Sequence, residues 1–397
     1  MYSVADAVRT VLQRVPRLPT EPVPLARARG RVLAMDVIAT RALPGFDSSA
    51  MDGYAMRAAD VPGTLPVVGT AAAGGDTQPV PAGAAARIFT GAPVPPGLDT
   101  VVMQEDATRT GDLVTLPAAR VGGHVRRRGE DVAPGDRVLT AGTRLTAWHL
   151  GLLAALGHAT ILVARAPRVA VIATGDELVD VTTEPGFGQL VDSSAHALLG
   201  LVEEAGGTAT HLGIAKDELA SLAALLAAAA DHDVIITTGG VSVGDRDHVR
   251  PALAAAGIEL ALYKVAMKPG KPFAFGVRAG AVAQPVFGLP GNPVSTIVGF
   301  ELFVRPALLA MQGATVVERP RVPVVLEGGY TKQAGRAHFL RATVTRDGAT
   351  LRAVPHPRQG SAMLSSLVGC NALVELPADL TELPPGASTP ALLLEAV

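Results

Sequence analysis

The stretch DVIITTGGVSVGDRDH, residues 233–248, decides the fold and the place of the chemistry. Val234 to Ile236 is a β-branched run that predicts a buried strand of a parallel sheet, and Gly239-Gly240 predicts the turn that ends it. In open α/β sheets, ligands bind beyond the carboxyl ends of the strands, where backbone N–H groups can approach an anion. The loop then supplies one hydroxyl and two carboxylates: Ser242, Asp245 and Asp247. These oxygens suit a phosphate held with magnesium, whereas the alternative interpretation is a glycine turn with solvated acids.

Alternating strand and helix patterns surround this stretch. After Pro167 the chain reads RVAVIAT, AHALLGLVEEAGG, TATHLGIAKD and ELASLAALLAAAADH, which predicts a doubly wound α/β domain. Glu177 follows the first of these strands and Asp217 follows the second, although a helix N-cap is the alternative role for Asp217. Two acidic loops are therefore expected at one edge of the sheet.

Lysine usage points to a second group of candidates. Only five of the 34 basic residues are lysines, and three of them, Lys264, Lys268 and Lys271, surround the turn KPGKP. Lysine is a compact point charge rather than a planar fork, so we expect these lysines to bind a small anion; the alternative is a solvated charged face. In the next loop, GLPGNPVS, Asn292 can cap a long helix with Pro293 at its first position. Its N-terminal amides, with Ser295 and Thr296 facing outward, predict an anion site unless they serve only as a cap.

The flanking regions add further candidates. Asp52 lies in a turn within PGFDSSAMDGYAMR and could equally form a local Asx-turn. Residues 61–121 predict a small β-rich domain, in which Thr90 presents a hydroxyl on a turn. Beyond Arg319, short alternating strands predict a small β-barrel or sandwich. Its candidate ligand contacts are Arg336, Arg341 and Ser361.

Composition excludes several classes of protein. A length of 397 residues predicts two to four domains, and a net charge of -2 argues against nucleic acid as a partner. The N-terminus lacks a leader pattern, and the apolar stretch 145–164 is interrupted by glycines and histidines, so we expect a soluble cytoplasmic protein with no membrane partner. The single cysteine, Cys370, excludes an internal disulfide and any cysteine-cluster metal site.

Eight motifs in order resemble those of one known family. They are SAMDGYA (49–55), TGAPVPPG (90–97), VVMQED (101–106), RGEDV (128–132), TGDEL (174–178), TTGGVSVGDRD (237–247), KPGKPFAFG (268–276) and GLPGNPVS (288–295). Together they resemble the molybdopterin molybdenumtransferase family, which comprises the MoeA proteins and the gephyrin E domain. The resemblance runs from about residue 2 into the predicted barrel.

The resemblance implies an elongated, multi-domain α/β plus β subunit that forms homodimers. Four parts are expected: a discontinuous linking domain (1–45 and 124–164), a small β-rich domain (46–123), a MogA-like α/β molybdopterin-binding domain (165–314) and a C-terminal β-barrel (315–397). It also implies an activity in molybdenum cofactor biosynthesis, in which adenylated molybdopterin and molybdate react with magnesium and AMP is released. A molybdopterin adenylyltransferase and recipient molybdoenzymes are the implied protein partners.

Carried over by position, the resemblance assigns roles to residues of this chain. Lys268, Lys271, Ser295, Arg341 and Ser361 resemble the molybdate-binding groups, Pro290 and Pro293 would fix the loop that closes the pocket, and Thr90 would come from the partner subunit. The substrate-binding candidates also include Ser242, Lys264 and Arg336. The acids implied to hold magnesium and orient water are Asp52, Asp131, Glu177, Asp217 and Asp247, with Asp245 as a further magnesium ligand.

One position departs from the family pattern. The family often has Asp-Ser-Asn before the helix that follows TGDEL, whereas this chain has Asp192-Ser193-Ser194, so we expect altered hydrogen bonding to the substrate rather than loss of activity. Two other functions stay open at this point. An adenylyltransferase would need only the central domain, and a scaffold role, as in gephyrin, would not follow from fold similarity alone.

Overall fold

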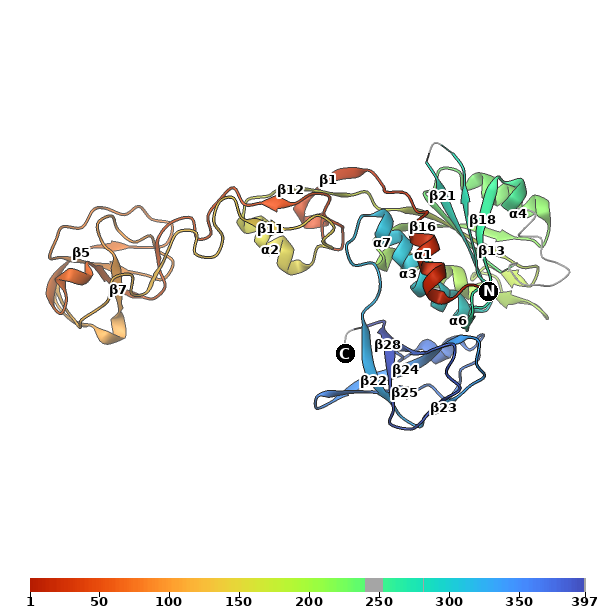
Figure 1. Cartoon of the computed structure of the whole chain (residues 1–397). Helices are drawn as coiled ribbons and strands as arrows, with labels where there is room; N and C mark the ends of the chain where they lie inside the picture. The colour runs from red at the N-terminus through yellow and green to blue at the C-terminus, as the bar shows by residue number, and fades with distance from the viewer. Residues whose placement is uncertain (240–252, 281, 396–397) are drawn as a thin grey trace.

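A computed structural model describes residues 1–239, 253–280 and 282–395. The chain forms an elongated molecule, with a small β-rich domain at one end and an α/β domain beside a C-terminal barrel at the other (Figure 1). Paired extended segments connect the two ends. The predicted ligands Ser242, Asp245 and Asp247 lie outside the described residues.

The α/β domain is built on a six-stranded sheet, as the sequence predicts. Its order is β16-β13-β17-β21-β20-β18, in which the first four strands are parallel and the last two pairings are antiparallel. The bounds are β13 (Arg168–Thr174), β16 (Thr208–Ala215), β17 (Val234–Thr238), β18 (Ile258–Tyr263), β20 (Ala274–Arg278) and β21 (Gln284–Leu289). In β17, Val234 and Ile236 enter one core and Ile235 enters the other. Burial on both faces is why this strand is continuously apolar.

Several of the described helices pack on the sheet and carry the chain onward. They are α3 (Ser193–Glu204), α4 (Leu219–Ala228) and a long C-terminal stretch that consists of α6 (Pro293–Gly299), a π-helical turn (Phe300–Val304) and α7 (Arg305–Met311). By length and apolar composition alone, the stretch Pro293–Met311 could cross a membrane. Because 89% of it is buried inside the protein, it has the character of a core helix.

A buried ion pair anchors the π-helical turn. Glu301 is only 3% exposed, and its carboxylate accepts two hydrogen bonds of 2.9 Å from the guanidinium of Arg319. Arg305 lies 4.0 Å from the same carboxylate, and burial lowers its pKa to about 10. Arg319 also donates to the backbone carbonyl of Leu394. This network therefore fixes the long helix to the segment that leads into the barrel.

The linking region is made of short antiparallel pairs between two distant parts of the chain. The pairs are β1 (Thr20–Pro24) with β12 (Thr160–Ala164), β2 (Val37–Ile38) with β11 (Arg137–Leu139), and β3 (Ser48–Ser49) with β10 (Val125–Arg126). Helix α2 (Ala147–Ala155) also lies in this region. The predicted boundary at residue 1 does not fit, because α1 (Val4–Leu12) buries Ala7 and Val11 in the core of the α/β domain. We propose that the linking domain starts near β1 and that the other boundaries stay as predicted.

The small domain is a β-sheet with its own two cores. Its order is β7-β4-β6-β5-β9-β8. The bounds are β4 (Gly53–Met56), β5 (Gly63–Ala71), β6 (Ala85–Ile88), β7 (Thr100–Met103), β8 (Thr108–Thr110) and β9 (Leu113–Leu116). Gly53 is needed where β4 meets β7, because a Cβ atom there would lie 1.9 Å from the carbonyl oxygen of Val102.

The C-terminal region closes into a five-stranded barrel, as one of the two predicted architectures requires. The order β24-β25-β22-β28-β26 is closed by pairing of β26 with β24. The bounds are β22 (Arg321–Leu326), β24 (Ala337–Asp347), β25 (Thr350–Pro355), β26 (Ala372–Leu376) and β28 (Ser388–Leu393). A short strand from the α/β domain, β19 (Met267–Lys268), joins β24 in parallel. The lysine-rich turn is therefore held against the barrel.

Candidate functional site

A cavity of about 640 Å³ lies at the carboxyl ends of the parallel strands, where the sequence predicts the site. Thr174 and Thr238 end β13 and β17 in its wall, and Pro293 opens α6 on the opposite side. Glu177 and Asp217, two of the predicted acids, also line it. The structure thus brings together two acids that are 40 positions apart in the sequence, although the part of the loop after residue 239 is not described.

Bare backbone forms part of the wall. Gly239 has a φ of +83°, and a Cβ atom there would lie 2.5 Å from the carbonyl oxygen of Thr174. A Cβ atom at Gly291 would lie 3.4 Å from the Cα atom of Gly239. Glycine is needed at residue 239 both for its left-handed conformation and for this close approach. The two glycines therefore leave bare backbone in the wall, although the N–H of Gly239 itself donates to the carbonyl of Leu289 at 3.1 Å.

Asp192 contributes a further carboxylate to the wall, and the sequence does not predict it as a site residue. Its Oδ1 caps α3 by accepting from the backbone N–H groups of Ser194 and Ala195 at 3.1 Å. Its Oδ2 is buried, lies 3.6 Å from Nε2 of His211 and has no hydrogen-bond partner within residues 1–239, 253–280 and 282–395. Ser194, which stands where the family often has Asn, is 6% exposed and also lines the cavity. The helix-capping position of Asp192 is the pattern that could have identified it.

The barrel supplies another part of the wall. Ala362 and Leu364 line the cavity, and the backbone carbonyl of Ser361 accepts a hydrogen bond of 3.1 Å from the N–H of Val294 in α6. Arg341 stands behind this loop, fully buried, and its guanidinium donates to the carbonyl oxygens of residues 358, 359 and 360 and to Ser366. This arrangement favours a role for Arg341 in positioning the loop of Ser361. It favours this role more than the direct contact with an anion that the sequence predicts.

The first turn of α6 differs from the prediction, because both Ser295 and Thr296 are buried and do not face outward. Thr296 does not face outward; it is fully buried, and its hydroxyl donates to the carbonyl of Pro290 at 2.6 Å. Ser295 is 3% exposed and lies beside the lysine-rich turn, because a Cβ atom at Gly270 would be 3.7 Å from its carbonyl oxygen. The hydroxyl of Thr296 stabilises the Pro290 loop and is not available to an anion.

The predicted lysines lie on a basic face between the α/β domain and the barrel. Lys268 is exposed and aligned with His338 across the β19–β24 pair. Lys332 and Arg336 are close enough to lower the pKa of the same histidine. Lys271 is exposed as well. Lys264 takes a left-handed conformation, with a φ of 65°, and its Nζ lies 4.9 Å from the centre of the Tyr263 ring. These positive groups give the turn the charge that an oxyanion needs.

His338 reports on this basic face. It is 5% exposed, and burial together with the charges of Lys268, Lys332 and Arg336 lowers its pKa from 6.5 to about 4. Between these two pH values the unfolded chain binds a proton that the folded chain excludes. The contribution of His338 to stability is therefore complete above pH 6.5 and is lost as the pH falls toward 4.

Replacing His338 by Phe is expected to weaken the dependence of the unfolding free energy on pH between about 6.5 and 4, because Phe packs like the imidazole but binds no proton. Chemical denaturation at a series of pH values measures this slope. His124→Asn is the matched control, since His124 is exposed with a φ of 50° that Asn tolerates. An unchanged slope in His338→Phe would contradict the buried, neutral state of this histidine.

The remaining predicted residues lie away from the cavity within one chain. Asp52 precedes β4 in the small domain, and its Oδ1 accepts hydrogen bonds of 2.7 Å from both the N–H and the hydroxyl of Thr90. Asp131 is exposed in the linking region, where its N–H donates to the carbonyl of Leu43. The small domain lies at the opposite end of the molecule from the α/β domain (Figure 1). These residues therefore do not complete the cavity of their own chain.

Replacing Thr90 by Val is expected to raise the pKa of Asp52 toward its ordinary value. The backbone N–H and the hydroxyl of Thr90 both lower that pKa, and Val removes only the hydroxyl bond. Titration of the Asp52 carboxyl by NMR measures the change. Thr182→Val is the matched control, because Thr182 holds Asp180 with the same pair of bonds and should leave Asp52 unaffected. No shift in Thr90→Val would show that the hydroxyl bond is absent in solution.

The two predicted acids that line the cavity suit a magnesium ion. Among the described residues, no three His, Cys, Asp or Glu side chains gather closely enough to form a ready metal site. Magnesium in phosphate-handling proteins is usually held by one or two carboxylates, with waters and substrate phosphates completing its shell. Glu177 and Asp217 supply that number of hard oxygen ligands, so the donor set fits the ion.

Comparison with known proteins places these features in a family. Family models match along nearly the whole chain: the MoeA N-terminal region (domain I and II) at residues 2–157, a probable molybdopterin binding domain at 170–310, and the MoeA C-terminal region (domain IV) at 323–394.

Full-length relatives give the same result. Molybdopterin molybdenumtransferase 2 of Mycobacterium tuberculosis is 39% identical over 406 residues, which cover 97% of this chain and 98% of that protein. The molybdopterin molybdenumtransferase of Haemophilus influenzae is 36% identical over 385 residues, covering 95% of this chain and 94% of that protein. The crystal structure of a molybdopterin biosynthesis MoeA protein from Pyrococcus horikoshii has a TM-score of 0.86 at 32% identity and covers 99% of this chain and all of that one. The chain described here belongs to the MoeA family of molybdopterin molybdenumtransferases.

Proposed function

We propose that this chain catalyses the reaction for which its full-length relatives are named, the transfer of molybdenum to molybdopterin. The observation that supports the proposal is the acid-lined cavity at the carboxyl ends of the parallel strands. Residues of the barrel region form part of the wall of this cavity. A stand-alone α/β domain would lack that wall. The architecture therefore favours the transferase over an adenylyltransferase.

The substrate would be adenylated molybdopterin, with its phosphates over the loops of Gly239 and Gly291. The glycines leave these loops without side chains, so the phosphates would approach the backbone closely. Glu177 and Asp217 would hold magnesium, with Asp245 and Asp247 as further candidates. When bound, this ion would neutralise charge on the phosphoanhydride that is cleaved. The same two carboxylates would orient the water that releases AMP.

Molybdate would bind on the basic face beside the cavity. Lys268 and Lys271 offer positive charge, and Ser361 offers a hydroxyl on the loop that Arg341 supports. Lysine suits a compact tetrahedral dianion because its ammonium group can approach from many directions. A lysine-to-methionine change at residue 268 would therefore weaken the use of molybdate more than the binding of the pterin.

A homodimer would explain the distant acids. Asp52, Thr90 and Asp131 lie outside the cavity of their own chain, in the small domain and the linking region, and would complete the cavity of the partner.

The single free cysteine, Cys370, suits a reducing cytoplasmic setting.

The test is AMP release from adenylated molybdopterin by the purified protein, measured with and without molybdate and with magnesium present or chelated. AMP release that requires both molybdate and magnesium is expected. If the pterin binds but is never cleaved, the adenylated compound is a ligand rather than a substrate, and the scaffold or adenylyltransferase functions become the better explanation.

A further inference from the structure

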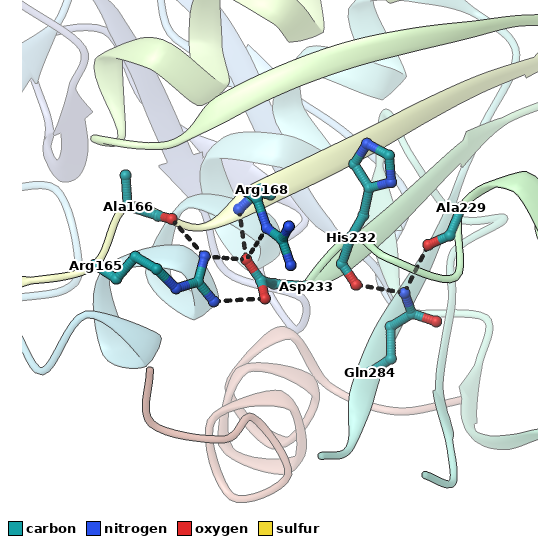
Figure 2. Close-up of polar contacts among 7 residues, drawn as sticks. All are labelled: Arg165, Ala166, Arg168, Ala229, His232, Asp233 and Gln284. Carbon is teal, nitrogen blue, oxygen red and sulfur yellow. Dashed lines mark hydrogen bonds and ion pairs between the residues drawn. The ribbon is translucent and has the colours of Figure 1, made fainter. Parts of the chain in front are cut away.

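A second cavity, of about 520 Å³, lies at the opposite edge of the same sheet, where the parallel strands begin. Arg168, at the start of β13, and Gln284, at the start of β21, both line it (Figure 2). The acid-lined cavity lies at the other ends of these strands. At about 3.3 Å per residue, the two cavities are roughly 20 Å apart. This second cavity is therefore separate from the proposed active site.

Both chain crossings into the linking region form walls of this cavity. Residues 16–19 lead from α1 to β1, and residues 165–168 lead from β12 to β13, so each crossing contributes side chains to the cavity. The backbone N–H of Arg165 also donates to the carbonyl of Pro19 at 2.8 Å, which holds the two crossings together. A ligand here would touch both segments that connect the two ends of the molecule.

Positive charge exceeds negative charge in the walls. Four arginines, Arg17, Arg165, Arg168 and Arg278, face two aspartates, Asp231 and Asp233. Within residues 1–239, 253–280 and 282–395, Asp233 is the one carboxylate that forms ion pairs with any of the four arginines.

Asp233 is shared between two guanidinium groups, as Figure 2 shows. It accepts hydrogen bonds of 2.8 and 2.7 Å from Arg165, accepts another of 2.7 Å from the backbone N–H of Arg168, and lies 3.5 Å from Nε of that residue. Burial alone would raise the pKa of Asp233, but the bonds from Arg165 and Arg168 outweigh it and lower that pKa. Asp233 is therefore ionised, and its one negative charge faces the two positive charges of Arg165 and Arg168. One of these two positive charges stays unbalanced.

Within the part of the chain that the structure describes, the hydrogen-bond partners of the other two arginines are neutral groups. Arg17 donates to the carbonyl of Ala310, and Arg278 donates to the carbonyl of Leu226 and to the side chain of Gln284. The Nε atom of Arg278 is buried and has no hydrogen-bond partner among the described residues. Burial lowers the pKa of Arg278, so its charge is held at a cost that an anion in the cavity would reduce.

Apolar groups make up much of the remaining wall. They include Pro16, Leu18, Pro19, Met311 and several alanines. Pockets of roughly 300–1,000 Å³ with mostly apolar walls and a few polar groups are typical of small-molecule sites. We propose that this cavity binds a small organic anion, a carboxylate or phosphate monoester carried on an apolar body. The proposal concerns a second site and does not depend on the proposed reaction.

The test uses 8-anilinonaphthalene-1-sulfonate, a fluorescent anion with an apolar body, titrated into the full-length protein. Saturable binding at one site per chain is expected. The double variant Arg17→Gln with Arg168→Gln should weaken this binding at least tenfold, because it removes two positive charges from the wall. Both side chains are exposed, so their loss spares the buried contacts. Ala230→Trp fills the cavity from an exposed wall position without removing a charge, and should weaken binding by a similar factor.

Arg137→Gln is the matched control. Arg137 is 61% exposed and lies 3.3 Å from Asp36, which resembles the 55% exposure of Arg168 and its 3.5 Å distance to Asp233. Binding in this control should equal that of the unmodified protein. Unfolding midpoints of all variants identify any that fail to fold. The proposal would be overturned if both the double variant and Ala230→Trp bound the probe as tightly as the unmodified protein, or if no saturable binding occurred at all.

Competition then identifies the anionic group. Displacement of the probe by AMP supports a phosphate monoester, and displacement by benzoate supports a carboxylate. Displacement by inorganic phosphate alone would show a simple oxyanion site and overturn the requirement for an apolar body. Hydrogen exchange gives a second readout, in which amides of residues 16–19 and 165–168 should exchange more slowly in the bound protein.

Discussion

Replacing Glu177 by Gln is expected to lower the rate of AMP release from adenylated molybdopterin by about 10²–10³-fold, the usual cost of removing one preorganised charged group from a reacting centre. Glu177 lies in the wall of the cavity just after the end of β13, and its carboxylate lies close to the Cα atom of Gly175, where a side chain would collide with it. Gln has nearly the same shape but cannot bind magnesium as a carboxylate does. Single-turnover measurements at saturating substrate check the chemical step directly.

Glu184→Gln is the control for this change. Glu184 is an exposed acid seven positions further along the chain, outside the cavity wall, so its loss should leave the rate unchanged. Substrate binding by Glu177→Gln should be close to normal, which separates loss of chemistry from loss of affinity. A rate within threefold of the unmodified protein would remove Glu177 from the proposed machinery.

Replacing Glu301 by Ala is expected to lower the free energy of unfolding by about 3–5 kcal/mol, which is typical when one partner of a buried ion pair is removed. Arg319 would lose two hydrogen bonds of 2.9 Å and keep its longer, 3.7 Å ion pair with Glu204, and Arg305 would keep its buried charge without the carboxylate that lies 4.0 Å from it. Chemical denaturation followed by circular dichroism measures the loss. The effect should appear in the transition of the α/β domain and the barrel, because Arg319 also bonds to Leu394.

An exposed ion pair provides the comparison. Glu318 pairs with Arg321 at the surface, with side chains 44% and 35% exposed, so Glu318→Ala should cost no more than about 1 kcal/mol. The contrast between the two variants isolates the effect of burial. Similar small losses in both would mean that Glu301 and Arg319 are solvated in solution.

The sheet and its active edge could be predicted because local patterns decide them. Val234 to Ile236 is continuously apolar since its side chains enter two different cores, and Gly239 is needed for a left-handed turn. Each of these requirements is visible in neighbouring residues. The acids at the ends of β13 and β16 follow from the same rule, since carboxyl ends of parallel strands share an edge.

Other features depend on partners that are remote in sequence. The π-helical turn carries Glu301, whose ion-pair partner Arg319 is 18 residues away, whereas helical periodicity alone predicts an ordinary helix. Thr296 lies at the start of a helix and so resembles an anion-binding hydroxyl, but the carbonyl of Pro290 takes its hydrogen bond. Arg341 carries a charge that suits molybdate, yet its donors are used by the backbone of residues 358–360. Sequence spacing does not identify these competing acceptors.

The pairing of β3 with β10 aligns Ser49 with Val125 and Ser48 with Arg126. Everything between these strands leaves and re-enters the molecule at one point, as an insertion whose two ends are neighbours. Such a segment can be exchanged, shortened or lost in evolution without changing the register of the strands that carry it. Deleting it and joining β3 to β10 by a short turn should therefore yield a folded truncated protein, which offers a compact starting point for protein engineering.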